Sequence, residues 1–158
     1  MSGTELINWN GLSTHPDFRS HTGAMFRFGG GLGSPIQMSV KQKLNMDSST
    51  TSELVAVHQG LPKVLWVKLF LEAQGYLIDK NIVYQDNQSA ILLEKNGKKS
   101  SSKRTRHLNI RYFMVTDQVE KGNITIKYCP TDEMIGDFMT KGLQGIKFVK
   151  FRKAIMGH

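Results

Sequence analysis

Cysteine is nearly absent from this sequence, which has only Cys129 among 158 residues. One cysteine cannot form an intrachain disulfide or a cysteine-based metal cluster, and such scarcity is typical of a reducing compartment. No stretch approaches the ~18 apolar residues of a membrane span, and residues 1–9 lack the basic start and apolar run of a signal peptide. We therefore expect a cytoplasmic protein without a membrane partner, with the nucleus as the alternative location.

Acidic residues are also scarce: 13 Asp and Glu stand against 21 Lys and Arg, giving a net charge of +8 and a pI near 9.7. This balance favours a polyanionic partner such as nucleic acid. Between Glu94 and Asp117 there is no acid at all, but seven cations. Such a segment either follows a nucleic-acid backbone or is a solvated loop. The seven are Lys95, Lys98, Lys99, Lys103, Arg104, Arg106 and Arg111.

Hydrophobic periodicity predicts one α/β domain. Alternation at 24–28 and 36–40 predicts two strands joined by a turn at 29–33, and residues 6–9 hint at a short strand before them. A long apolar helix follows from 53 to 71, which Pro62 should kink or split and Gly75 should end. Further strands are expected at 82–85 and 124–128, with helices at 87–94, 108–122, 132–141 and 146–156. This order predicts a mixed sheet flanked by helices.

Three carboxylates occupy informative positions: Glu53 in the first turn of the long helix, Asp86 directly after a strand, and Asp137 in the helix after the last strand. Oxygen ligands without His or Cys favour Mg²⁺ or Mn²⁺. If the three converge, two-metal hydrolysis of a phosphodiester is the expected chemistry. Each also has a structural alternative. Glu53 can face the helix dipole, Asp86 can cap the next helix, and Asp137 can be a solvated surface acid.

Around these acids the chain resembles the ribonuclease H domains of copia-type retrotransposon polyproteins. Four segments carry the likeness: SSTTSELVA (48–56), VYQDNQSA (83–90), KRTRHLNIRY (103–112), and YCPT (128–131) with DFMTK (137–141). Together they extend the resemblance over residues 19–155.

The resemblance implies a ribonuclease H-like fold, with antiparallel strands first and parallel strands after them. It implies cleavage of the RNA strand in RNA·DNA hybrids and a reverse transcriptase domain upstream in a virus-like-particle-associated polyprotein. Glu53, Asp86 and Asp137 are then the catalytic, Mg²⁺- or Mn²⁺-binding residues. The implied nucleic-acid contacts are Asn87, Gln88, Ser89, Lys103, Arg104, Arg106, His107 and Arg111.

The sequence departs from the family at the first strand. Members carry a fourth carboxylate about ten residues before the arginine that matches Arg19, and that offset falls on Trp9, between Asn8 and Asn10. A missing bridging acid leaves a two-metal site under-charged, so we expect severely impaired hydrolysis or a non-catalytic nucleic-acid-binding remnant. We expect the domain at 1–142, with a degenerate, poorly matched start over 1–12 that is unrelated sequence joined to a fragment, and a basic helix at 143–158.

Overall fold

The computed structural model describes residues 7–10, 19–27, 36–45, 48–78, 80–96 and 106–157. Five strands form one sheet: β1 (Ile7–Asn10), β2 (Arg19–Phe26), β3 (Ile36–Asn45), β4 (Ile82–Gln85) and β5 (Thr125–Tyr128). Their order is β3-β2-β1-β4-β5. The predicted turn at 29–33 lies outside the described residues.

The sheet is mixed, as expected. β2 is antiparallel to both β1 and β3, whereas β4 is parallel to both β1 and β5. The first strand, expected to be degenerate, is a regular four-residue strand at the centre of the sheet. Its register places Asn8 opposite Met25 and Tyr84, and Trp9 opposite Ala24.

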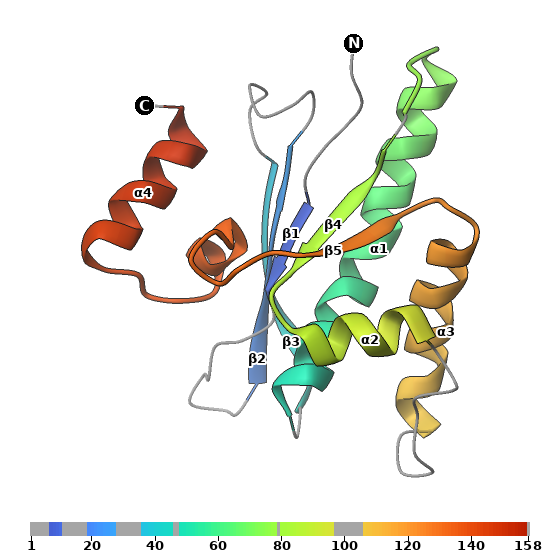
Figure 1. The fold of residues 1–158 in the computed structure, drawn as a ribbon, viewed down its shortest axis with the longest axis horizontal. Helices are drawn as coiled ribbons and strands as arrows, with labels where there is room; N and C mark the ends of the chain where they lie inside the picture. Colours follow the sequence, from blue (N-terminus) through green and yellow to red (C-terminus); the bar gives the residue numbers. More distant parts are fainter. Residues whose placement is uncertain are drawn as a thin grey trace.

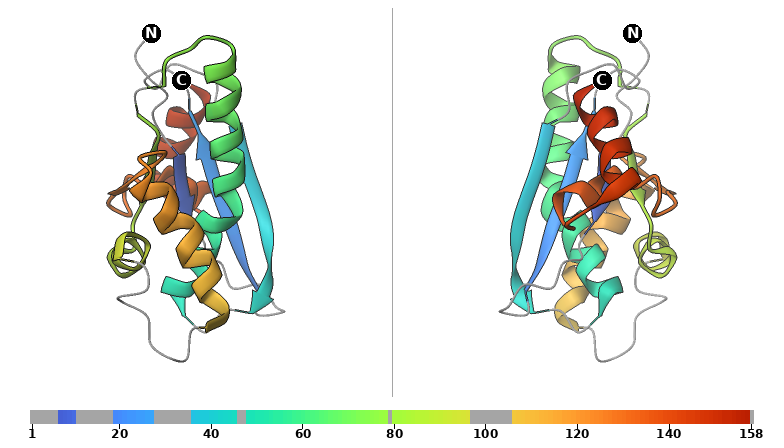
Figure 2. Two further views of the ribbon diagram at one scale, coloured as in Figure 1. Left: turned by 90° about the vertical axis from the view of Figure 1, so that its right-hand side faces the viewer. Right: turned by 90° about the vertical axis from the view of Figure 1, so that its left-hand side faces the viewer.

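The helices lie on both faces of the sheet (Figures 1 and 2). They are α1 (Ser49–Ala73), α2 (Gln88–Asn96), α3 (Arg106–Glu120), the 3₁₀ helix η3 (Ile135–Met139) and α4 (Gly145–Met156). Thr22 of β2 donates a hydrogen bond to Gln59 of α1 at 2.9 Å, so this side of the strand faces α1. A Cβ on the next residue, Gly23, would lie 2.9 Å from the Gly136 carbonyl oxygen, so the opposite side faces η3.

Helix α1 provides most of the helical contribution to the core. Ser48 caps it by accepting a hydrogen bond from the Thr51 amide at 3.2 Å. Pro62, which was expected to kink or split this helix, does not split it: the helix is continuous from Ser49 to Ala73, with Leu61 and Val64 buried on either side of the proline. As predicted, the helix ends before Gly75, whose φ is +86°. The main core comprises Ala24, Phe26, Met38, Val57, Leu61, Val64, Val83, Ile91, Val115, Ile124 and Ile126.

Contrary to the expectation from sequence, α1 has the length and apolar composition of a membrane span. Its residues Ser52–Val57 are nevertheless buried within the domain, and Leu61 and Val64 are part of the core cluster. The first half of α1 therefore packs as a core helix, whereas Trp66, Leu69 and Phe70 in its second half are exposed.

Two predicted helical positions need correction. Because the helix begins at Ser49, Glu53 is its fifth residue and lies beyond the first turn, where the helix dipole acts most strongly. Asp137 lies in a five-residue 3₁₀ helix rather than in an α-helix over 132–141. The amide of Asp137 bonds to the Met134 carbonyl, and that of Thr140 to the Asp137 carbonyl, each three residues back.

Candidate nucleic-acid and cation site

Asp137 is a buried and ion-paired member of the three predicted ligands. Its side chain is 1% exposed, and an ammonium group pairs with each of its oxygens. Lys141 Nζ lies 2.9 Å from Oδ1, and Lys147 Nζ lies 3.2 Å from Oδ2. Two positive charges from the chain itself therefore neutralise this buried carboxylate.

Lys147 belongs to α4 and is held by more than Asp137. Its ammonium group donates to the Thr131 carbonyl at 2.9 Å and lies 3.9 Å from Asp132 Oδ1. It also sits 5.4 Å from the centre of the Phe151 ring, within the range of a cation–π contact. Lys147 thus joins α4 to both the β5–η3 segment and η3.

Asp86 follows β4 and is half-buried. Its Oδ2 accepts a hydrogen bond of 3.2 Å from the Thr131 hydroxyl. Since the Thr131 carbonyl accepts from Lys147, one residue connects Asp86 to the ion pairs of Asp137. Burial raises the pKa of the Cys129 thiol, and the negative charges of Glu133, Asp86 and Asp137 raise it further. The predicted ligands Asp86 and Asp137 therefore both lie in the surroundings of this thiol.

Glu53 lies in a different environment. It is 3% exposed on α1, and its charge acts on Glu94 of α2, which is fully buried. Burial raises the pKa of Glu94 well above its usual value, the Gln85 amide partly offsets this, and Glu53 adds to the rise. Neither Glu94 oxygen has a hydrogen-bond partner of normal geometry among the described residues. The Glu94 carboxyl is therefore neutral over a wider pH range than an exposed glutamate.

The three predicted ligands come from three different elements. Glu53 lies on α1, Asp86 directly follows β4, and Asp137 lies in η3. Within the described ranges no three His, Cys, Asp or Glu side chains are grouped so that they could hold a metal ion. Their oxygen chemistry suits a hard cation, but the described arrangement does not fit one, because lysines already occupy Asp137.

The predicted nucleic-acid contacts are only partly described. Asn87, rather than Asp86, caps α2: its Oδ1 accepts from the Ala90 amide at 3.1 Å. Gln88 and Ser89 are exposed on the first turn of α2. Arg111 is half-buried, and its charge, after burial itself, lowers the pKa of His58 on α1. Lys103 and Arg104 lie outside the described residues, as do the side chains of Arg106 and His107.

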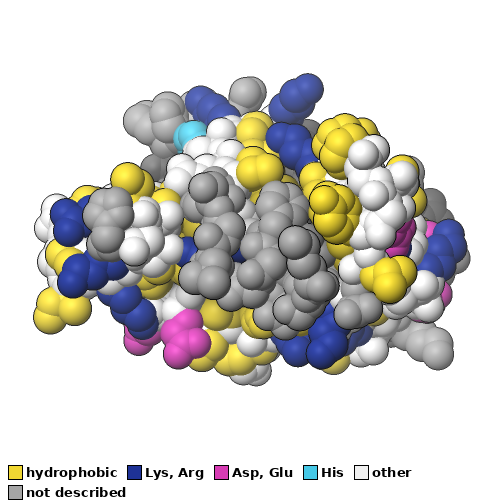
Figure 3. All heavy atoms as spheres, turned by 90° about the horizontal axis from the view of Figure 1, so that it is seen from above, with side chains coloured by type: hydrophobic (Ala, Val, Ile, Leu, Met, Phe, Trp, Pro, Cys, Tyr) yellow, Lys and Arg dark blue, Asp and Glu magenta, His cyan; other side chains and the backbone are white. Residues whose placement is uncertain are grey.

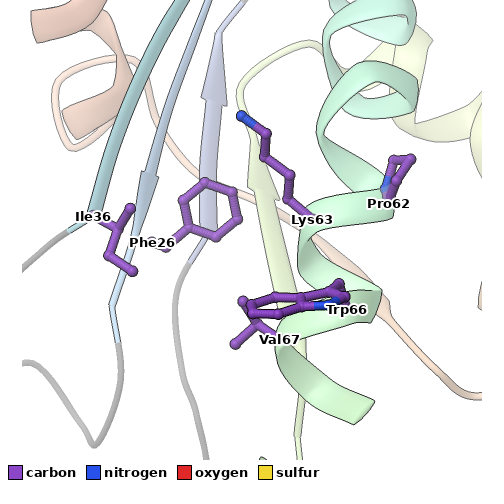
Figure 4. Close-up of a pocket in the computed structure, with 6 residues that line it drawn as sticks. All are labelled: Phe26, Ile36, Pro62, Lys63, Trp66 and Val67. Carbon is purple, nitrogen blue, oxygen red and sulfur yellow. The ribbon is translucent and has the colours of Figure 1, made fainter. Parts of the chain in front are cut away.

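An apolar hollow of about 400 Å³ lies between α1 and the ends of β2 and β3 (Figure 4). It is lined by Phe26, Ile36, Pro62, Lys63, Trp66 and Val67. None of the predicted ligands or nucleic-acid contacts lines it, so we do not assign it to the candidate site.

Sequence reasoning missed Thr131, Lys147 and Glu94. The 45-residue separation of Thr131 and Asp86 gives no local signal. Lys147 appeared only as one charge of a basic helix. Glu94 did carry a signal, because it lies four and three residues after Ala90 and Ile91, both buried, and so on the inward side of α2.

Comparison with curated proteins relates the chain to transposon polyproteins. It is 31% identical over 140 residues to the retrovirus-related Pol polyprotein from transposon TNT 1-94 of Nicotiana tabacum, covering 89% of this chain and 10% of that protein. It is 29% identical over 118 residues to the Pol polyprotein from transposon RE2 of Arabidopsis thaliana, covering 74% of this chain and 8% of that protein. The chain thus spans about a tenth of the length of these relatives. No protein-family model matches it.

Solved structures share the fold at low sequence identity. LC11-RNase H1, isolated from compost by a metagenomic approach, superposes with a TM-score of 0.58 and 11% identity over 85% of this chain and 89% of its own. The N-terminal RNase H domain of a Mycobacterium tuberculosis protein gives a TM-score of 0.52 and 10% identity, over 96% and 95% of the two chains.

Proposed function

This chain is a ribonuclease H-like domain related to the Pol polyproteins of copia-type retrotransposons, and we propose that it binds RNA·DNA hybrids while hydrolysing them very weakly. The observation that carries this proposal is the pairing of both Asp137 carboxylate oxygens with lysines of the same chain. A carboxylate engaged in this way does not offer the free negative charge that a catalytic cation needs.

The charge distribution supports binding. Lys150, Arg152 and Lys153 are exposed on α4, and Lys95 is exposed at the end of α2. Figure 3 shows the molecule from above the view of Figure 1, with several Lys and Arg side chains on the left, where α4 lies, and an Asp and Glu patch below them. The implied contacts Asn87, Gln88 and Ser89 begin α2 directly after Asp86. A basic surface of this kind gives salt-dependent affinity for a phosphate backbone.

Two further features support weak hydrolysis. The central strand β1 has the sequence INWN and carries no acid. Asp86 accepts a hydrogen bond from the Thr131 hydroxyl, and the charge of the buried Glu53 helps to raise the pKa of the buried Glu94. Ribonuclease H relatives generally use divalent cations. By ancestry, Glu53, Asp86 and Asp137 would be the residues of this chain that hold Mg²⁺ or Mn²⁺. Hydrolysis through that arrangement is the second candidate function, favoured only by the carboxylate chemistry.

The chain's place in a larger protein is part of the proposal. Because its relatives are about ten times longer, we propose that it acts beside a reverse transcriptase domain of a Pol polyprotein, in the cytoplasm and in association with virus-like particles.

Equilibrium binding of a fluorescent RNA·DNA hybrid tests the proposal. Changing Lys103, Arg104 and Arg106 to Gln should weaken binding at least about tenfold at low salt and reduce the salt slope by about 2 to 3. A control variant changes three exposed lysines on other segments, Lys43, Lys80 and Lys127, to Gln, and should change the affinity less than about twofold. Equal losses of hybrid affinity in the two variants, or no hybrid binding by the wild type at low salt, would contradict the proposed function.

A further inference from the structure

We propose that Lys147 is an internal cation that competes with divalent metal ions for Asp137 and so sets the cation affinity of this site. The inference deepens the proposed function, since it concerns a carboxylate of the same site. It is carried by the contacts of Asp137 and α4, and does not depend on hybrid binding.

The first step is the crowding of Asp137. A Mg²⁺ ion coordinates carboxylate oxygens at about 2.0 to 2.1 Å. Oδ2 of Asp137 already faces an ammonium nitrogen at 3.2 Å, and Oδ1 faces another at 2.9 Å. A divalent ion approaching either oxygen meets both the bulk of an ammonium group and its like charge. Binding of the ion therefore requires a lysine to leave.

The second step distinguishes the two lysines. Lys141 lies four residues after Asp137 and belongs to the same local segment. Lys147 comes from α4 and is held there by the Thr131 carbonyl and the Phe151 ring. Its position at Asp137 therefore depends on how α4 docks.

The third step is that α4 is fixed by contacts that do not involve Asp137. Phe151 is buried, Phe148 stacks on Phe138 with ring centres 5.5 Å apart, and the Arg27 guanidinium donates to the Ala154 carbonyl. The helix should remain docked when the charge of Lys147 is removed. Lys147→Met keeps the aliphatic stem that packs near Phe151 and removes only the ammonium group.

The experiment measures free Mn²⁺ by electron paramagnetic resonance during titration of the whole chain at low ionic strength. We expect Lys147→Met to bind one Mn²⁺ at least about tenfold more tightly than wild type. Lys150→Met is the matched control: Lys150 lies on the same helix and donates to the Asp132 carbonyl at 3.0 Å, whereas Asp137 is paired with Lys141 and Lys147. It should resemble wild type. Adding Asp137→Asn to Lys147→Met should abolish the gain.

Equal affinities in Lys147→Met and Lys150→Met would overturn the inference, as would a gain that survives Asp137→Asn. If Lys147→Met is not folded, Lys147→Gln provides the same comparison, with folding of each variant checked by near-ultraviolet circular dichroism. Hybrid binding by the same proteins separates the two proposals. A gain in Mn²⁺ affinity without hybrid binding contradicts only the proposed function, and hybrid binding without that gain contradicts only the role of Lys147.

Discussion

The buried ion pair between Asp137 and Lys147 should contribute more to stability than an exposed pair with a shorter distance. The comparison is Asp117 with Lys121, whose atoms are 2.7 Å apart but whose side chains are 45% and 60% exposed. The Asp137–Lys147 distance is 3.2 Å, with exposures of 1% and 28%. Burial therefore predicts the larger coupling energy for Asp137–Lys147, whereas distance predicts the larger coupling energy for Asp117–Lys121.

Double-mutant cycles measure the two coupling energies. Exposed helix pairs four residues apart typically give about 0.3 to 0.5 kcal/mol. For Asp137–Lys147 the low local dielectric strengthens the attraction, but the partial exposure of Lys147 screens it, so we expect about 1 to 3 kcal/mol. The variants are Asp137→Asn and Lys147→Met in one cycle, and Asp117→Asn and Lys121→Met in the other, each followed by urea unfolding.

Salt provides the control within this experiment. Raising NaCl to about 0.5 M should remove most of the exposed coupling and leave most of the buried one, because buried pairs are screened less. An Asp137–Lys147 coupling no larger than the Asp117–Lys121 coupling, or one equally sensitive to salt, would refute the view that Asp137 is an internally neutralised buried charge.

Two further predictions concern packing and protonation. The pKa of the Glu94 carboxyl is raised in the folded protein. As the pH rises from about 4.5, this carboxyl is therefore deprotonated first in the unfolded chain, so the wild type becomes less stable as the pH increases above that value. Glu94→Gln should therefore be more stable than wild type at pH 7, and the difference should vanish below about pH 4.5 in urea unfolding. Parallel pH profiles of the two proteins would contradict this. Gly23→Ala should cost at least about 1 to 3 kcal/mol in thermal unfolding, because its Cβ would meet Thr140 and the Gly136 carbonyl. Gly142→Ala, with open space around it, is the control.

Much of the fold could be predicted from sequence because it depends on local periodicity. The alternation predicted at 24–28, 36–40 and 124–128 and the apolar stripe of α1 located these elements, but β2 begins at Arg19 and ends at Phe26, and β3 continues to Asn45. The predictions for individual elements were wrong where the local sequence pattern conflicts with packing. Pro62 lies within a continuous helix, and the segment around Gly136 forms a 3₁₀ helix. The order of the predicted elements indicated a mixed sheet, and the family resemblance added that its antiparallel strands come first and its parallel strands after them.

The candidate site was less predictable, because its contacts join distant parts of the chain. The positions of Glu53, Asp86 and Asp137 in the predicted elements, and then the resemblance, singled out these acids, and their joint role in cation binding stays a prediction. Thr131 lies in the YCPT segment that carries the resemblance, but neither its contact with Asp86 nor the contact of Lys147 with Asp137 follows from the local sequence. Such contacts depend on how η3 and α4 pack, which periodicity does not encode.

The most direct test of the central claim is a single-turnover assay with the protein in excess over a labelled RNA·DNA hybrid and with Mg²⁺ present. We expect the hybrid to be bound throughout and to remain uncut over hours. Rapid cleavage of the RNA strand that is lost in both Glu53→Gln and Asp86→Asn would contradict the account.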